Sequence, residues 1–187
     1  MRRQKARILD EYLAASARAG DRTAFSQLAA RWQPKLYAHA CRLMGDAELA
    51  RDVVQDGWGD IAKGLTRLDD AAVFPAWAYR IITRRAADVI RRIQRDRRLT
   101  DGFATEPVPE DNGAAAIEAH ADRTPLTKAM ASLPPEQSAA IALFYLEDFS
   151  VAEVAAALSV PTGTIKTRLM HARRKLRSAL EGGMENG

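Results

Sequence analysis

The sequence predicts an all-helical protein of two domains, and three observations lead to that prediction. Apolar residues recur at helical spacing (i, i+3, i+4, i+7) through most of the chain. No stretch alternates apolar and polar residues as a half-buried strand does. Over residues 99–124 the composition changes to glycine, proline and acids, as in a flexible acidic linker. We therefore expect one helical domain over 1–98 and a second over 125–187.

Composition narrows the class of partner. The formal net charge of +4 over 187 residues favours a polyanionic partner. The single cysteine, Cys41, cannot form an internal disulfide, which fits a reducing compartment. The three histidines lack the spacing of metal ligands, so we expect no metal and no cofactor. The longest apolar run, 139–146, is far shorter than a membrane span, so we expect a cytoplasmic protein without membrane insertion.

The first domain should begin with three helical segments. Apolar periodicity predicts a helix over about 8–19 that ends at Gly20. A second segment covers 23–31, and Pro34 should break or kink the helix before it continues over 36–44. Gly45 should end that segment, because glycine readily adopts the left-handed conformation found after helix ends.

Asp46 is the expected N-cap of the next helix, because a short acid can accept hydrogen bonds from the exposed N–H groups of the first turn. Three glycines in or near this helix should each weaken it by about 1 kcal/mol, and nothing in the sequence explains them. They are Gly57, Gly59 and Gly64. The outward face of the helix carries Asp52, Gln55, Asp56 and Asp60.

Pro75 suits the first turn of a long, basic helix that runs to about residue 98. Eight arginines against two acids depart from the mixed charge of an ordinary surface helix. Aromatic residues lie beside them, and stacking rings with backbone-binding cations suit a single nucleic-acid strand. For Trp77 itself, core packing is the favoured interpretation. The candidate contacts are Trp77, Tyr79, Arg80, Arg84, Arg85, Asp88, Arg91 and Arg92.

The second domain should end in a helix-turn-helix. Helices are expected over 125–132 and 135–146, the second beginning at Pro135. Ser150 and Glu153 then form a capping box, and Pro161 breaks the helix that they begin. The last helix, capped by Thr162, buries one apolar stripe and presents hydroxyls and cations that suit bases and phosphates. The candidate duplex contacts are Thr164, Lys166, Thr167, Arg168, His171 and Arg174.

These motifs together resemble those of the bacterial extracytoplasmic-function (ECF) sigma factors, over about 10–98 and 125–180. The segment 52–58, DVVQDGW, is similar to the family's D-x-x-Q-[ED]-x-[FW] motif. The segment from Phe74 to Arg92 resembles its promoter-melting helix, and 163–168, GTIKTR, resembles its recognition helix. Arg84 and His171 depart from the family's usual asparagine and arginine, which concerns promoter sequence.

The resemblance implies a transcription factor that is not itself an enzyme. Its first domain would dock on the clamp helices of core RNA polymerase through the outward face Asp52, Gln55, Asp56 and Asp60. The basic helix would hold the unpaired −10-type strand of promoter DNA, and the helix-turn-helix would read the −35-type duplex. Arg168 would point to base edges and Lys166 to phosphate. The resemblance also implies an anti-sigma factor as the regulatory partner.

Two alternatives remain open at this point. A helix-turn-helix regulator that does not join polymerase would explain the second domain, but it leaves the acidic face and the aromatic residues unused. A metal-dependent nuclease using Asp52, Asp56 and Asp60 is geometrically reasonable, because these acids lie at i, i+4 and i+8. Exposed acids on one helix face are usually only solvated, so this alternative is the weaker one.

Overall fold

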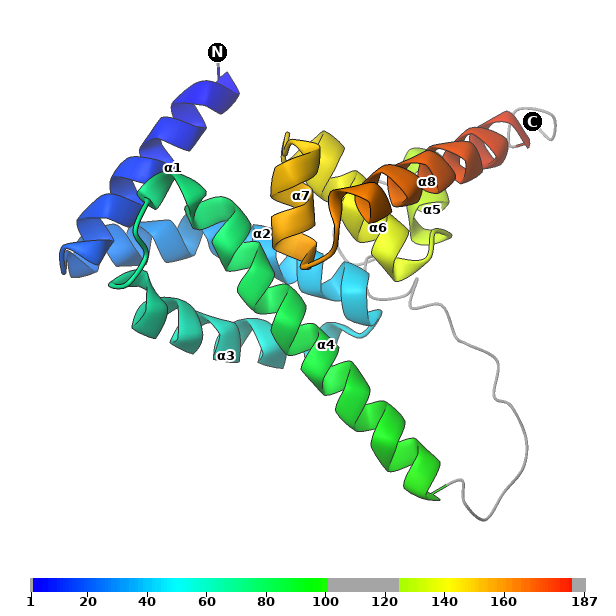
Figure 1. Cartoon of the computed structure of the whole chain (residues 1–187), viewed down its shortest axis with the longest axis horizontal. Helices are drawn as coiled ribbons and strands as arrows, with labels where there is room; N and C mark the ends of the chain where they lie inside the picture. Colours follow the sequence, from blue (N-terminus) through cyan, green and yellow to red (C-terminus); the bar gives the residue numbers. More distant parts are fainter. Residues whose placement is uncertain (1, 101–124, 183–187) are drawn as a thin grey trace.

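The computed structural model is all-helical over the residues that it describes, 2–100 and 125–182 (Figure 1). The linker was predicted for 99–124. Residues 99 and 100 instead end a helix, and the rest of the predicted linker lies outside the described residues. The first domain comprises α1 (Arg2–Arg18), α2 (Arg22–Met44), α3 (Ala47–Leu65), a short turn η1 (Ala71–Val73) and α4 (Phe74–Thr100). The second comprises α5 (Pro125–Ala131), α6 (Pro135–Ile141), the π-helical turn η4 (Ala142–Leu146), α7 (Val151–Leu158) and α8 (Thr162–Gly182).

The predicted break at Pro34 is wrong, because α2 continues through it as one helix. Proline in a helix interior costs about 3 kcal/mol, so tertiary packing must offset that cost. Trp32 and Leu36, on either side of the proline, are both buried in the core. The Trp32 ring meets the Phe74 ring edge-on at 5.5 Å between centroids, which joins α2 to the start of α4.

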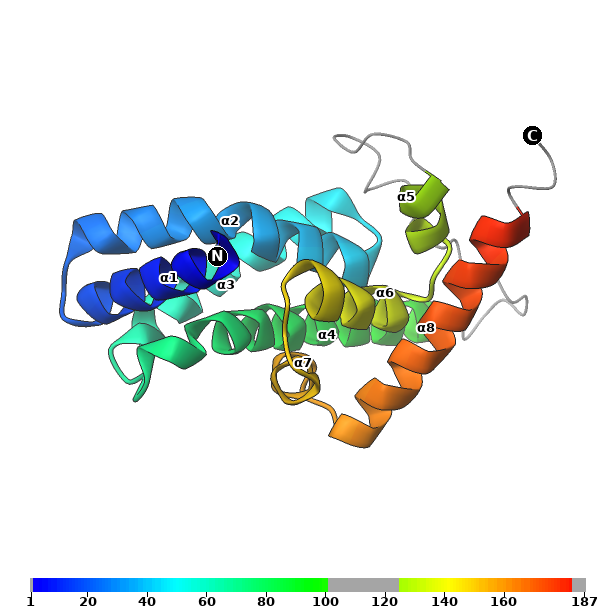
Figure 2. The same ribbon diagram turned by 90° about the horizontal axis from the view of Figure 1, so that it is seen from above.

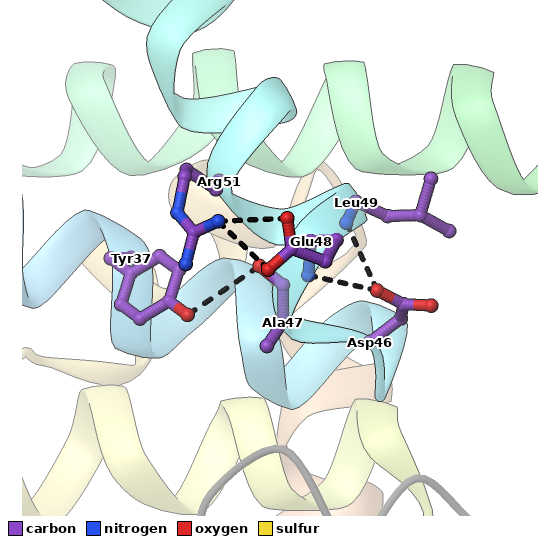
Figure 3. A network of polar contacts seen from close by, with 6 residues as sticks. All are labelled: Tyr37, Asp46, Ala47, Glu48, Leu49 and Arg51. Carbon is purple, nitrogen blue, oxygen red and sulfur yellow. Dashed lines mark hydrogen bonds and ion pairs between the residues drawn. The ribbon is translucent and has the colours of Figure 1, made fainter. Parts of the chain in front are cut away.

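The boundary between α2 and α3 lies where the sequence predicted it, whereas the side-chain cap at the start of α2, Asp21, was not predicted. Asp46 accepts hydrogen bonds from the N–H groups of Glu48 and Leu49 at 2.9 and 3.0 Å (Figure 3). Gly45, at φ 69°, ends α2 in the left-handed conformation. Beside this cap, Arg51 binds both carboxylate oxygens of Glu48. The loop between α2 and α3 is therefore fixed at both ends by short-range interactions.

The glycines of α3 have a structural explanation that the sequence did not supply. A Cβ built on Gly64 would lie 2.8 Å from Cζ2 of Trp77, and one built on Gly57 would overlap Cδ1 of Ile82. Both partners belong to α4, so these two glycines let α3 and α4 approach closely. Gly59 has open space around it and faces solvent. The helix-weakening effect of glycine is thus compensated by packing at two of the three positions.

The second domain contains the predicted helix-turn-helix. Ser150 and Glu153 form the capping box at the start of α7, and Ile165, Leu169 and Ala172 are buried on one side of α8. Three boundaries differ from prediction. The helix predicted over 125–132 ends at Ala131. The helix predicted over 135–146 changes to a π-helical turn after Ile141. The N–H of Ile165 bonds to the carbonyl of Pro161, so α8 begins one residue before the predicted start.

The two domains are packed against one another, with α7 beside α4 and α6 beside α2 (Figures 1 and 2). Buried residues of both domains form one continuous apolar cluster. At its centre, Tyr79 of α4 is 1% exposed and meets Phe149, which precedes α7, edge-on at 5.6 Å. The ring of His39, from α2, lies 4.9 Å from the other side of Tyr79.

His39 is completely buried and neutral. Its Nε2 lies 2.9 Å from Oγ1 of Thr83, which itself donates to the carbonyl of Tyr79, so Nε2 must carry the proton and donate. Nδ1 has no hydrogen-bond partner among the described residues. Burial, and then the positive charge of Arg42, lowers the pKa of His39 to about 3. Protonation would place a charge and an unpaired donor in the core.

The glycines of α3 give a first prediction. Gly64→Ala should lower the free energy of unfolding by about 1–2 kcal/mol, because the added methyl group must displace the rigid Trp77 ring. Gly59→Ala should raise it by about 0.5–1 kcal/mol, because it only improves helix propensity. Urea unfolding of the two variants and the parent measures both changes. A similar effect of both substitutions would show that Trp77 does not pack on Gly64.

His39 gives a second prediction, on pH. The unfolded chain protonates this residue near pH 6.5 and the folded chain only near pH 3, so stability is lost as pH falls through that window. Between pH 7 and pH 5 this loss should be about 2 kcal/mol. Urea unfolding at both pH values measures it. His39→Gln should lose clearly less stability over the same interval, and an equal loss would contradict the assignment.

Candidate polymerase and nucleic-acid interfaces

The acidic residues predicted for polymerase docking lie along the outer face of α3. Asp52, Gln55 and Asp56 are exposed, and Asp60 is partly exposed one turn further along. The opposite face of the helix buries Val53, Val54 and Ile61 in the core of the first domain. The buried stripe therefore fixes which way the acids point, as the helical spacing predicted.

Arg85 of α4 lies between two of these acids. Its Nε is 2.6 Å from Oδ2 of Asp60, and its Nη1 is 3.1 Å from Oδ2 of Asp56. The hydrogen bond from Arg85 lowers the pKa of Asp60 and raises that of Arg85 itself. Arg85 was predicted as a DNA contact, and in this structure its guanidinium is occupied by the docking face instead.

The remaining arginines of α4 form an exposed basic surface. Arg80, Arg84, Arg91 and Arg92 all face solvent, and Arg91 is paired with Asp88 one turn before it. The surface thus offers several cations along one helix, with a single acid of the candidate set among them. This arrangement suits the phosphates of a strand that lies along α4.

The two aromatic candidates occupy different positions from those cations. Tyr79 is buried between the domains, and burial followed by the carboxylate of Glu147 raises the pKa of its hydroxyl. Trp77 is half-buried against Phe74 and Gly64. Neither ring is presented to solvent as a stacking platform. Their contact with an unpaired base remains a prediction, and both residues also support the core.

The polar side chains of the recognition helix, α8, differ in their exposure to solvent. Lys166, Thr167 and Arg174 are exposed, and Thr164 and His171 are partly exposed. Arg168, which was predicted to point to base edges, is less exposed than Lys166: its side chain is 19% exposed and forms an ion pair with Glu136. Glu136 lies at the start of α6, 32 residues away, so no local pattern could reveal the pair.

Two family models match the chain, one in each of its two helical domains. Residues 28–96 match the family Sigma-70 region 2, and residues 123–176 match Sigma-70, region 4. The chain is 28% identical to the ECF RNA polymerase sigma factor SigW of Bacillus subtilis, over 86% of this chain and 91% of that protein. It is 30% identical to SigM of Mycobacterium tuberculosis, over 89% and 82% respectively.

The chain is also similar to a sigma factor of known structure. The sigma factor RpoE, in complex with the anti-sigma factor NepR from Bartonella quintana, is 27% identical, with a TM-score of 0.65 over 84% of this chain and 96% of that one. The chain belongs to the ECF sigma factors of the sigma-70 family. It binds core RNA polymerase and directs promoter-specific initiation. A regulator that does not join polymerase is therefore not favoured.

The sigma factor has further features that sequence reasoning missed. A cleft of about 710 Å³ lies between the packed domains. Among the residues that line it are Met44, Ile90, Pro134 and Arg168. A second cleft of about 690 Å³ brings Leu158 and Ser159 of the helix-turn-helix beside Arg84 and other residues of α4. Each cleft is lined by residues of both domains, so it exists only because the domains pack together. Helical periodicity in the sequence does not predict that packing.

Other classes of site find little support in the described residues. No group of three or more His, Cys, Asp or Glu side chains there could hold a metal ion. Within the same ranges, no helix is long and apolar enough to cross a membrane. The relatives are transcription initiation factors rather than known enzymes.

Proposed function

We propose that the sigma factor docks on core RNA polymerase through Asp52, Gln55 and Asp56 of α3. The observation that carries this proposal is that the three side chains are exposed on one face of a helix whose other face is fixed by the core. The resemblance of this segment to the family motif assigns the clamp helices of the largest subunit as the partner. Asp60 is held by Arg85 and contributes to the same face from its edge.

Promoter recognition is divided between the two domains. The exposed arginines of α4 bind the backbone of the unpaired −10-type strand, where phosphate contacts supply affinity. The exposed face of α8 enters the major groove of the −35-type duplex, where base edges supply specificity. Arg168 must leave Glu136 to reach a base, so its contact competes with an ion pair inside the domain.

The partners indicate where and how the protein acts. Because polymerase and promoter DNA are its partners, we assign the protein to the cytoplasm and a role in binding rather than in a catalytic step. RpoE of Bartonella quintana is bound by an anti-sigma factor in its solved complex, and we assign a partner of the same kind to this chain. The nuclease alternative is disfavoured because Arg85 is already paired with both Asp56 and Asp60, so a metal ion would have to compete with its guanidinium.

Run-off transcription tests the proposed function as a whole. The purified chain and its cognate core RNA polymerase should initiate from discrete sites in genomic fragments, and core polymerase alone should not. A chain that binds those fragments without any transcript would favour the regulator that does not join polymerase.

The docking face gives a third prediction. Asp52→Lys should weaken binding to core polymerase about tenfold or more, because reversing a charge at the interface replaces attraction with repulsion. Asp52 is a cleaner choice than Asp56, whose reversal would also repel Arg85. Glu11→Lys, an equal charge change on an exposed position of α1, is the matched control and should bind normally. Gel filtration of each variant with core polymerase measures the binding.

The recognition helix gives a fourth prediction. Arg168→Ala should cost about 1–3 kcal/mol with the best duplex and relax the preference at one base pair. Lys166→Ala should weaken all duplexes alike and reduce the salt dependence by about one phosphate contact. Binding of −35-type duplexes and single-base variants over a range of salt concentrations measures both effects. Equal, sequence-independent losses for the two variants would contradict these roles.

A further inference from the structure

The contacts between the domains form a discrete set of interactions centred on the segment that precedes α7. Nζ of Lys35, on α2, lies 2.7 Å from Oε2 of Glu147, and Phe149 packs on Tyr79. Arg42, also on α2 and partly buried, lies within electrostatic range of the same carboxylate. Between Glu147 and Phe149, Asp148 adopts φ 60°, a conformation that costs a non-glycine residue energy and that persists where the surroundings fix it.

A second ion pair closes the other side of the contact. Nη2 of Arg7, on α1, lies 2.5 Å from Oε1 of Glu153, the capping-box residue of α7. Two helices of the first domain thus reach charged groups at the two ends of one short stretch, 147–153. The same stretch supplies the aromatic contact with α4, so it holds the two domains together.

We propose that this arrangement is a self-inhibited state of the sigma factor, closed by a latch that consists of Lys35–Glu147, Arg7–Glu153 and Tyr79–Phe149. The inference rests on the proposed function, because it concerns the surfaces assigned there to DNA. Binding of core polymerase and promoter DNA requires the latch to open. The free chain therefore regulates its own access to polymerase before any other protein acts on it.

The first argument is one of distance. The −10-type and −35-type elements lie about 25 base pairs apart, or roughly 85 Å of B-form duplex. In this structure α7 of the helix-turn-helix lies directly against α4, so the two domains cannot engage both elements at once. The 24 residues of 101–124 can extend to about 80 Å, so the chain itself allows the domains to separate.

The second argument is that the DNA surfaces face the seam between the domains. Leu158 and Ser159 lie in one cleft with Arg84 and Arg91, where an unpaired strand along α4 would run. Arg168 lines the other cleft together with Ile90 of α4. Each domain therefore borders part of the surface that the other needs, and opening removes this steric restriction from side chains that already face solvent.

The third argument is that the two ion pairs of the latch are weak, so a change in one of them can shift the balance between the closed and open forms. Partly exposed ion pairs contribute little each, and Lys35 and Arg7 have side chains that are 40% and 53% exposed. Lys35 lies outside the docking and DNA surfaces, but its Nζ also lies 4.8 Å from the centroid of the Trp32 ring, so folding is checked for each variant at this position. Reversing one charge should shift the balance between closed and open forms about fivefold.

Chemical cross-linking tests whether the closed state exists in solution. A carbodiimide joins an amine directly to a carboxylate, so it should link Lys35 to Glu147 in the free chain, as detected by mass spectrometry of peptides. Lys35→Arg keeps the charge but removes the reactive amine, and is the matched control. Core polymerase should reduce the yield of this link several-fold. No link in the free chain, or an unchanged yield with core polymerase, would overturn the proposal.

Transcription tests whether the closed state inhibits. Lys35→Glu should lower the sigma concentration for half-maximal run-off transcription about fivefold, and Glu147→Gln, which removes the charge without placing a cation beside Arg42, should lower it by a smaller factor. The two changes lie in different domains, and helix content and melting temperature check that each variant folds. Lys35→Arg keeps the charge and should leave this concentration within about twofold of the parent. Folded Lys35→Glu and Glu147→Gln variants that do not gain activity would overturn the latch.

The outcomes separate this inference from the proposed function. A parent chain that initiates normally, with single variants no better than the parent, contradicts only the self-inhibition. A parent chain that never initiates with its cognate core polymerase contradicts the proposed function, and the inference falls with it.

Discussion

The packing of Tyr79 is the contact on which the arrangement of the whole molecule depends. Its ring lies edge-on to Trp32 at 5.6 Å, to His39 at 4.9 Å and to Phe149 at 5.6 Å. The first two contacts hold α4 on α2 within the first domain, and the third holds the second domain on the first. Edge-on aromatic pairs contribute beyond their buried area, and here one ring takes part in three of them. Stability and domain arrangement therefore share a single residue.

The same helix also connects the two functional surfaces of the first domain. Ile82 and Ala86 of α4 are buried, while its arginines face outward, and Arg85 reaches across to Asp56 and Asp60 of α3. The close approach of α3 and α4, permitted by the α3 glycines, brings these opposite charges within hydrogen-bonding distance. The docking face and the basic helix are consequently one electrostatic unit, and a change in either alters the charge that the other presents.

Much of the fold follows from short-range patterns in the sequence. Helical periodicity, the caps at Asp46 and Ser150, and the stop at Gly45 were correct because each depends on neighbours within four residues. The exposed acids of α3 were also placed correctly, since a buried stripe dictates which side faces solvent. The break at Pro34 was wrong because the cost of proline is local, whereas the packing of Trp32 and Leu36 that offsets it is not.

The sequence by itself determined the helical class, the helix-turn-helix and the family, because these depend on periodicity, capping and motif spacing. Only the tertiary structure decided which charged side chains are available. Arg85 is occupied by Asp56 and Asp60, and Arg168 by Glu136, through pairs separated by 25 to 32 residues. It also decided that the two domains meet. Contacts between segments far apart in sequence leave no periodic trace, because each side chain satisfies the same local pattern whether or not its distant partner is present.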